Sequence, residues 1–395
     1  MNILFQCSEY PPFRNGGIGT VTKVVAEELV RRGHNVSVCG YYSELPVRER
    51  VEEINGVTIY RFNKGTRKGA IRVFFFLLLN KIRLVGFLIQ KELSWYEKKI
   101  DAIIRKNQID VVEMTDFYNF NLYRAKLRYR RFDVPTVMRV HGSASFIQHF
   151  SGKNQAWVVD NDHRHFQRVD YLCSVSKFAE KYVKETFPDV FFRGEKVIYN
   201  SIESVFLKHN QPSSNKTILF IGKLIRTKGA YALAEAFNRI AVDFPDWSLH
   251  YAGTGEKALI LNLLSPENRE KVTFLGFCNR EKLAQEIDSC AFACIPTYFE
   301  NFSMVPLEIM GRTRTVIFTN RTSGKEIISD GIDGYTVDPE NIEEISEKMK
   351  NLMKNPLLRD MMAEKSYSKI EKNFTTDVVT DMLEDFYNVV KRTVE

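Results

Sequence analysis

The sequence predicts an α/β protein with two doubly wound domains, each a parallel sheet flanked by helices. Short β-branched runs alternate with helix-period sequence in both halves of the chain, a pattern typical of parallel strands joined by helical crossovers. The alternation stops once, at the polar stretch Lys208–Lys216, where Pro and Ser cluster as in an interdomain linker. With 395 residues, of which 44% are hydrophobic, the chain can bury two cores.

The first half contains six predicted strands, each followed by a helical pattern. They are Ile3–Cys7, Val36–Cys39, Val57–Arg61, Val111–Met114, Thr136–Val140 and Tyr171–Ser174. Between the first two, Ile18–Arg32 has amphipathic helical spacing, and Gly33 follows as a C-terminal cap. We therefore expect a first domain over residues 1–205.

The second half repeats the pattern with five predicted strands. They are Thr217–Ile221, Ser248–Tyr251, Val272–Leu275, Phe292–Ile295 and Thr315–Phe318. We expect a second domain over residues 206–375, followed over 376–395 by a helix that crosses back to the first domain. Ligands of doubly wound folds lie at the carboxyl ends of the strands, so two such domains facing a central cleft would hold their ligand there.

Positive charge is concentrated in the first half of the chain. The net charge is +7, but residues 1–200 hold 32 Lys and Arg against 21 Asp and Glu, whereas residues 201–395 hold 24 against 28. This excess suggests an anionic partner, such as a membrane surface, a phosphorylated acceptor or nucleic acid. A solvated basic face without a partner is the alternative.

The six cysteines are scattered, with no C-x-x-C pair and no histidine spacing that suits zinc. The first residues read as a strand and lack the basic segment and cleavage site of a signal peptide. Both features predict a cytoplasmic protein with free thiols.

Three glycines, Gly16, Gly17 and Gly19, lie between the first strand and the first helix. Bare N–H groups at a helix start can receive an anion or a sugar. No Gly-Lys-Ser/Thr follows, and Thr22 occupies the third glycine position of the dinucleotide fingerprint, so neither a P-loop nor that fingerprint is present. A simple tight turn is the alternative.

The first strand of the second half leads into FIGKLIRTKG, which contains Gly222, Lys223, Lys228 and Gly229. Two lysines beside a short turn at the carboxyl end of a strand can both point at one diphosphate. Their ammonium groups would neutralise the charge of a departing diphosphate.

Further along, YFENFSMVPLEIM places Glu300 and Glu308 across a loop and a helix start. A carboxylate in that turn can accept hydrogen bonds from the vicinal hydroxyls of a ribose. The backbone amides of residues 303–305 would point at a sugar or a phosphate. Either glutamate alone could instead be a partner of the helix dipole.

Together these segments resemble the retaining glycosyltransferases of family 4, which have the GT-B architecture of two facing Rossmann-like domains. YPPFRNGGIG…RGHNVSV resembles the glycine loop and first helix of the family. GKLIRTKG resembles its diphosphate motif, and ENFSMVPLE resembles its Glu-x-Phe-Gly-x-x-x-x-Glu motif. YAGTGEK and VTFLGF lie between these two in the expected order, so the resemblance spans nearly the whole chain.

The resemblance implies a set of site residues. Catalytic roles fall to Lys228, Lys223, Glu300 and His141, the last in RVHGSAS after a strand of the first domain. Donor binding falls to Gly16, Gly17, Gly222, Lys223, Lys228, Glu300, Asn301, Phe302, Ser303, Met304, Val305 and Glu308. In this scheme the lysines bind the diphosphate, Glu308 binds the ribose, and Glu300 and the backbone of residues 301–305 hold the donor sugar. The two glycines lie near the phosphates or the acceptor, and His141 faces the sugar near its reacting carbon.

Two positions depart from the family pattern. Lys223 stands where an arginine is usual, which removes a planar fork from the diphosphate contact. Ser303 replaces the usual glycine and adds a side chain beside the sugar.

The implied activity is retaining transfer of a sugar from a nucleotide-diphosphate donor, taken to be UDP-linked, to a glycan or lipid-linked acceptor. Surface polysaccharide or glycoconjugate synthesis would be the setting, without a metal or cofactor and without nucleic acid. Alternatives are an epimerase or a glycan phosphorylase of the same architecture, or a non-catalytic binder of sugar or nucleic acid. A phosphorylase would need a buried lysine for pyridoxal phosphate, and no segment recommends one.

The motif VVDNDHRHF raises the question of a metal. Asp160 and Asp162, with His163 and His165 nearby, could hold a metal-bound nucleotide sugar. The surrounding sequence reads as a polar helix, so we predict a solvated helix face instead.

Two basic segments are candidates for membrane contact. Lys68–Leu93 is strongly apolar with cations set into it, and Tyr123–Arg131 adds five more cations. The longest wholly apolar run, Val73–Leu79, is too short to cross a bilayer. The segment could lie on anionic lipid at the inner face of the membrane, or form a buried helix against the sheet.

Overall fold

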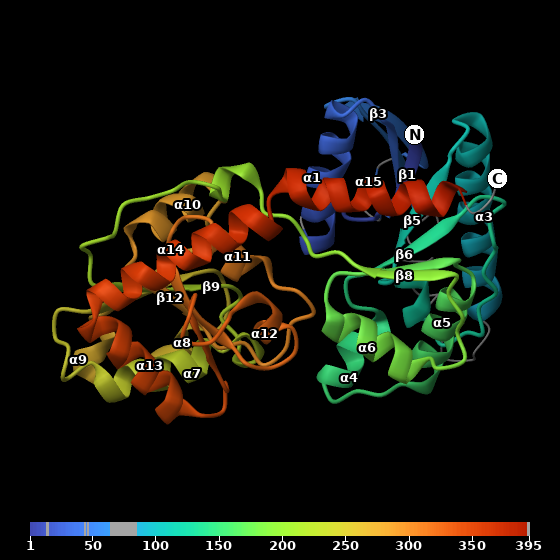
Figure 1. Cartoon of the computed structure of the whole chain (residues 1–395). Helices are drawn as coiled ribbons and strands as arrows, with labels where there is room; N and C mark the ends of the chain where they lie inside the picture. The colour runs from blue at the N-terminus through green and yellow to red at the C-terminus, as the bar shows by residue number, and fades with distance from the viewer. Residues whose placement is uncertain (13–15, 43–44, 46, 64–84, 393–395) are drawn as a thin grey trace. The chain divides into compact units, whose positions relative to one another are not determined.

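The computed structural model describes residues 1–12, 16–42, 45, 47–63 and 85–392. The chain divides into two compact units (Figure 1). Unit 1 comprises residues 1–199 and 379–395, and unit 2 comprises residues 200–378.

The core of unit 1 is an eight-stranded sheet in the order β3-β4-β2-β1-β5-β6-β7-β8. The strands are β1 Asn2–Gln6, β2 Asn35–Tyr42, β3 Glu49–Ile54, β4 Val57–Asn63, β5 Val111–Thr115, β6 Thr136–Val140, β7 Tyr171–Ser174 and β8 Gly194–Val197. All neighbours are parallel except β3 and β4, which form an antiparallel edge. In the centre, Ile3 of β1 lies opposite Val36 of β2 and Val111 of β5.

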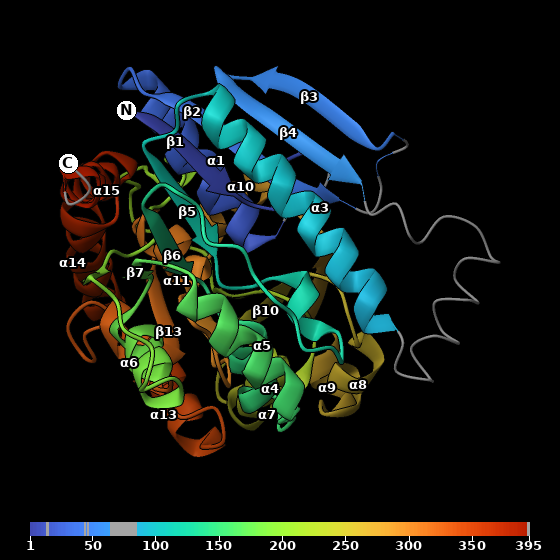
Figure 2. The same ribbon diagram turned by 90° about the vertical axis from the view of Figure 1, so that its right-hand side faces the viewer.

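Helices cover both faces of this sheet, and α3 lies along one face (Figure 2). They are α1 Gly17–Arg31, α3 Val85–Lys106, α4 Ala144–Phe150, α5 Ala156–Gln167, α6 Lys177–Thr186 and α15 Thr376–Arg392, with the short turn η2 Asn119–Leu122. Alternate side chains of a strand point to opposite faces. Leu4 therefore packs in the core beneath α3, whereas Ile3 and Phe5 pack in the core that holds α1 and α15.

Unit 2 contains a six-stranded, all-parallel sheet in the order β11-β10-β9-β12-β13-β14. Its strands are β9 Thr217–Ile221, β10 Ser248–Ala252, β11 Val272–Gly276, β12 Phe292–Ile295, β13 Thr315–Thr319 and β14 Tyr335–Val337. Its helices are α7 Ala230–Ile240, α8 Lys257–Asn262, α9 Pro266–Arg269, α10 Arg280–Ser289, α11 Met304–Met310, α12 Gly324–Ile327, α13 Ile342–Lys354 and α14 Pro356–Asn373, with turns η3 Ser204–Phe206 and η4 Arg226–Lys228. The predicted class of two doubly wound α/β domains is confirmed.

Three strands, namely β3, β8 and β14, were not predicted from the sequence. β3 is a charged edge strand whose residues are exposed or half-buried, so it lacks a buried alternating face. Its signal was the dipeptide Asn55-Gly56, where both residues have positive φ and close a two-residue hairpin between Ile54 and Val57. β8 and β14 span only four and three residues.

The polar stretch predicted to be a linker packs on unit 2. The amide of Lys208 donates to the carbonyl of Gly311 at 2.8 Å, and Nδ2 of Asn210 donates to Asp288 at 2.8 Å. The boundary between the units lies between Tyr199 and Asn200, ahead of this stretch.

The C-terminal helix α15 belongs to unit 1. Leu383 and Tyr387 lie in the core beside α1, and the Tyr387 hydroxyl donates to Oε2 of Glu113 at 2.5 Å. Burial raises the pKa of Glu113. The hydroxyl therefore supplies a hydrogen bond to a buried carboxyl group that water does not reach.

The apolar basic segment lies partly outside the described residues, which exclude 68–84 of its range. Residues 85–93 begin α3, where Val85, Ile89 and Leu93 are buried in the core. For this part the buried-helix alternative holds. Among the described residues, no helix combines the length and the apolar character needed to span a bilayer.

Candidate active site

Lys223 is positioned by a glycine-rich crossing at the carboxyl ends of β9 and β10. The amide of Gly222 donates to the carbonyl of Ala252 at 3.0 Å, so the two backbones run in contact beyond the strands. A Cβ atom on Gly253 would lie 1.8 Å from the carbonyl oxygen of Gly222, which explains a glycine there. Lys223 follows this crossing and is exposed. Within the described residues its ammonium group has no ion-pair partner.

Lys228 is held by a second turn, which packs on the loop after β12. Gly229 has a φ of +80°, and a Cβ atom on it would lie 2.1 Å from the carbonyl oxygen of Pro296. The carbonyl of Thr227 accepts hydrogen bonds from the amide of Tyr298 at 3.0 Å and from the hydroxyl of Thr297 at 3.1 Å. These bonds fix the β9–α7 turn to the loop that carries Glu300.

As a result, the ammonium group of Lys228 contacts the carboxylate of Glu300 directly. Their side chains are 33% and 23% exposed, so solvent reaches both partners. The amide of Glu300 also donates to the hydroxyl of Thr322 at 3.3 Å. The structure thus brings together two residues that lie 72 positions apart in the sequence.

Glu308 takes part in a separate, more buried charge cluster. Its side chain is 4% exposed, and its Oε1 accepts from Nη1 of Arg280 at 2.6 Å. Arg280 also pairs with Glu203 at 2.7 Å and lies over the ring of Phe206. Burial raises the pKa of Glu308, and Arg280 opposes that rise. In the described part of the chain, Oε2 is the Glu308 oxygen without a partner, so a ribose contact would use it.

Arg280 was not predicted from the sequence. Its signal was a cation in the first turn of the helix that follows β11, at the carboxyl end of that strand. Residue type and spacing alone do not distinguish it from other surface arginines, because its partners come from two distant segments.

The residues after Glu300 are mostly buried. Asn301, Phe302 and Ser303 are buried, and Met304 and Val305, which begin α11, are half-buried. Phe302 packs against Phe374 with ring centroids 6.2 Å apart. The apolar side chain therefore anchors the loop in unit 2.

In unit 1, His141 follows β6 on a loop held by Asp116. The carboxylate of Asp116 accepts from the amides of His141 and Gly142 at 2.8 and 2.9 Å. Burial and the nearby Arg139 lower the pKa of His141 to about 3. The imidazole is therefore neutral at neutral pH and can exchange hydrogen bonds with a hydroxyl without adding positive charge. Asp116 was also missed in the sequence, although it directly follows β5.

The three glycines differ in what surrounds them. A Cβ atom would lie 2.0 Å from a side-chain oxygen of Glu9 at Gly16, and 2.0 Å from the Glu9 carbonyl oxygen at Gly19. A Cβ atom on Gly17 would meet no other described residue within 4 Å, beyond its chain neighbours and its own helix backbone. Gly16 and Gly19 are thus explained by close packing of α1, whereas the described residues give no such explanation for Gly17.

The guanidinium group of Arg61 anchors the loop that precedes these glycines. This arginine is fully buried, and its guanidinium donates to the carbonyls of Tyr10 and Pro11 at 2.8 and 2.5 Å. Residues 13–15, which complete the glycine loop, lie outside the described residues.

The predicted solvated helix face is confirmed for Asp160, which is exposed, and His163 is half-buried. For Asp162 and His165 the prediction is wrong. Asp162 is fully buried and accepts from the amide of Ser145 and from Nδ2 of Asn121, both at 2.6 Å. His165 is also buried and bonds to the carbonyl of Thr115 at 3.2 Å. These polar groups face inward because they tie the loops after β5 and β6 to α5. Among the described residues, no cluster of three or more His, Cys, Asp or Glu side chains could hold a metal ion.

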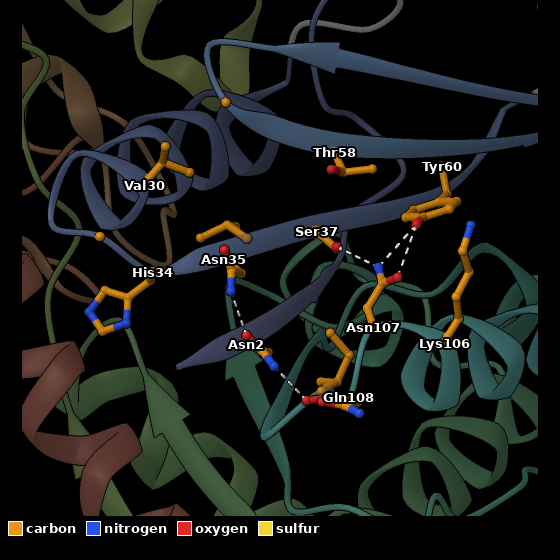
Figure 3. Close-up of a pocket in the computed structure, with 14 residues that line it drawn as sticks. Asn2, Val30, His34, Asn35, Ser37, Thr58, Tyr60, Lys106, Asn107 and Gln108 are labelled. Carbon is orange, nitrogen blue, oxygen red and sulfur yellow. Dashed lines mark hydrogen bonds between the residues drawn. The ribbon is translucent and has the colours of Figure 1, made fainter.

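The cavity of about 660 Å³ drawn in Figure 3 lies in unit 1, beside the amino-terminal ends of β1 and β2. His141, by contrast, follows the carboxyl end of β6. The side-chain amides of two asparagines that line this cavity are hydrogen-bonded to neighbouring residues. Nδ2 of Asn107 donates to Ser37 at 3.1 Å and to Tyr60 at 3.0 Å, and Nδ2 of Asn2 donates to the carbonyl of Gln108 at 2.9 Å. None of the predicted site residues lines it.

Two family models match consecutive parts of the chain. The model described as Glycosyltransferase Family 4 matches residues 15–203, and the model described as Glycosyl transferases group 1 matches residues 201–369. The first contains the glycine loop and His141, and the second contains both lysines and both glutamates. The chain belongs to the family 4 glycosyltransferases.

Sequence and structural similarity to known proteins is consistent with this family. An uncharacterized glycosyltransferase of Methanocaldococcus jannaschii is 26% identical over 98% of both chains. The solved sucrose-phosphate synthase of Thermosynechococcus elongatus has a TM-score of 0.76 and 14% identity, and the alignment covers 99% of each chain. HepE of Anabaena, solved in complex with UDP and glucose, has a TM-score of 0.66 and 16% identity over 98% of this chain and 99% of its own. The predicted GT-B fold and the enzyme class are confirmed.

Proposed function

We propose that this glycosyltransferase moves a sugar from a UDP-sugar to a hydroxyl of a glycan or lipid-linked acceptor, with retention of anomeric configuration. The contact between Lys228 and Glu300 carries the proposal. It joins the residue predicted to bind the diphosphate to the residue predicted to bind the donor sugar, at a place that solvent reaches. The complex of Anabaena HepE with UDP and glucose supports uracil as the base.

The charges suit a diphosphate. A solvent-exposed ion pair is worth only about 0–1 kcal/mol, so Lys228 can exchange part of its contact with Glu300 for phosphate oxygens at little cost. Charge-assisted hydrogen bonds to phosphate are stronger. Lys223 adds a second ammonium group at the end of β9. Both cations would stabilise the negative charge that develops on the departing nucleotide.

The proposed step conserves atoms and charge. The bond between the anomeric carbon and the β-phosphate oxygen breaks, its electron pair stays on that oxygen, and the sugar becomes oxocarbenium-like. The acceptor hydroxyl forms the new bond on the same face and gives its proton to the departing phosphate. A neutral His141 suits the role predicted for it, because a second positive charge would oppose the developing cation.

Incubation with UDP-, GDP-, ADP- and dTDP-sugars, followed by measurement of released nucleotide, tests this proposal. We expect release of UDP alone, and an unchanged rate after addition of EDTA because the proposed step uses ammonium groups in place of a metal. The anomeric proton coupling of the product, measured by NMR, reports retention. Conversion of the nucleotide sugar to an isomer without nucleotide release would instead indicate an epimerase.

We also propose that the enzyme works at the cytoplasmic face of a membrane, on a lipid-linked acceptor. The basic excess of the first half supports this proposal. Flotation with liposomes containing phosphatidylglycerol is the test. The protein should float with these liposomes and stay behind with neutral phosphatidylcholine liposomes, and equal behaviour with both would contradict the proposal.

A further inference from the structure

A smaller cavity of about 300 Å³ lies in unit 1, between the segment after η2 and α5. Trp157, Asp160, Asn161 and Arg164 line it from one face of α5, because their spacing follows the helical repeat. The facing segment contributes Arg124, Ala125 and Lys126. None of these residues belongs to the predicted donor site.

The cavity carries an excess of positive charge. Arg124, Lys126 and Arg164 are cations, and Asp160 is the one acidic side chain among the described residues that line it. Nearby arginines of the same segment are paired: Arg130 bonds to Asp101 at 3.0 Å, and Arg131 lies 3.5 Å from Asp170. In the described part of the chain, the three cavity cations have no such ion pairs.

Two hydrogen-bond donors in the lining are buried without partners. Nε1 of Trp157 and Nη1 of Arg164 are screened from solvent and find no acceptor in the described part of the chain. Buried donors of this kind are rare in proteins and need an explanation. The guanidinium of the exposed Arg124 lies 5.1 Å from the centroid of the Trp157 ring. This side chain therefore lies over the face of the indole at the cavity.

The amide of Asn161 does not compete for such a ligand. Its Oδ1 accepts from the amide of Leu127 at 3.3 Å, and its Nδ2 donates to the carbonyls of Asn121 and Tyr123 at 3.3 and 3.2 Å. Asn161 therefore fixes the facing segment against α5 and gives the cavity a rigid wall.

We propose that this cavity binds the phosphate group of a small phosphorylated ligand. A phosphate presents several strong acceptor oxygens and up to two negative charges, which match three cations and an unpaired indole N–H. The volume is at the lower end for ligand sites, so it fits a phosphate with about one sugar ring. This proposal is independent of the proposed transfer reaction.

Tryptophan fluorescence tests the site directly, because Trp157 is one of three tryptophans in the chain. The probes are mannose 6-phosphate, inorganic phosphate and phosphatidylglycerol vesicles, titrated at constant ionic strength, with mannose as the uncharged control. We expect mannose 6-phosphate to change the emission and mannose to leave it unchanged. Trp157→Phe should abolish the change, and calorimetry should show that this variant still binds but more weakly, because it lacks the indole N–H.

Charge variants decide whether the cavity itself is responsible. Arg124→Gln combined with Lys126→Gln should weaken phosphate binding at least tenfold, since both side chains are exposed and their replacement leaves the fold intact. Arg128→Gln removes an exposed cation of the same segment that does not line the cavity, and it should leave binding unchanged.

The three probes also identify the source of the phosphate. Tighter binding of mannose 6-phosphate or inorganic phosphate than of vesicles supports a soluble ligand, and the reverse supports a lipid headgroup. Absence of a response to all three probes, or equal loss of binding in the control variant, would overturn the proposal.

Discussion

The imidazole of His141 is half-buried, and its surroundings decide its charge. The imidazole follows β6 on a loop whose amides are held by Asp116, and burial together with Arg139 lowers its pKa to about 3. The folded protein therefore keeps this histidine neutral at a pH where an unfolded chain would protonate it. Its contribution to stability is present above pH 6.5 and is lost as the pH falls toward 3.

We predict that His141→Asn makes the protein less sensitive to acid. Between pH 7 and pH 5, the wild-type free energy of unfolding should fall by about 2 kcal/mol more than that of the variant, because each pH unit below the unfolded pKa costs up to about 1.4 kcal/mol. Urea denaturation at both pH values measures the difference. His149→Asn, at an exposed position of α4, serves as the control and should follow the wild type. Parallel pH dependence of wild type and His141→Asn would contradict this account.

The residues of the candidate site were predictable from sequence only in part. Lys228 and Glu300 were both assigned to the donor, and they are in contact. Arg280 and Asp116 were not identified, because an arginine beside Glu308 and an aspartate beneath His141 acquire their partners only through the fold. The inward-facing polar groups of α5 were misjudged for the same reason.

Among the elements, α15 shows how a distant segment completes a core. Its apolar face packs beside α1, and the Tyr387 hydroxyl donates to the buried Glu113. A second tie lies at the surface, where Arg32 bonds to Glu384. The helix therefore completes the core of unit 1, although it follows unit 2 in the sequence.

The variant Tyr387→Phe tests how much the hydrogen bond between Tyr387 and Glu113 contributes to the stability of unit 1. Removal of the hydroxyl leaves the buried Glu113 carboxyl without its donor, so we expect the free energy of unfolding to fall by about 1–3 kcal/mol. The midpoint of urea denaturation, followed by circular dichroism, measures the change. Tyr367→Phe, at a half-buried position of α14, is the matched control and should shift the midpoint little. An equal effect of both replacements would argue against a specific role of the Glu113 bond.

Strands of this protein were predictable where they are buried and rich in β-branched residues. All eleven runs identified in the sequence form strands. Ten of them are largely buried, because parallel strands covered on both faces read as continuous apolar segments, whereas the residues of β11 are exposed or half-buried. The edge strand β3 is charged and exposed, so only its Asn55-Gly56 turn could have indicated it. β14 spans three residues, too few for a periodic signal.

For the whole molecule, the glycosyltransferase family and the GT-B fold rest on matches that run from residue 15 to residue 369. The choice of donor and the roles of individual residues are proposals that depend on the charges around β9 and β12. The central claim among them is that the ammonium group of Lys228 stabilises the departing nucleotide diphosphate.

The most direct test is the turnover of Lys228→Ala with a UDP-sugar donor, measured as UDP release and compared with Lys216→Ala. Lys216 is an exposed, ion-paired lysine at the opposite end of the same strand, so it controls for loss of a surface charge. We predict a fall in turnover of about 10²-fold or more for Lys228→Ala, as for loss of an electrostatic donor, and near-normal turnover for Lys216→Ala, with both variants folded by circular dichroism. Near-normal turnover of folded Lys228→Ala would contradict the claim.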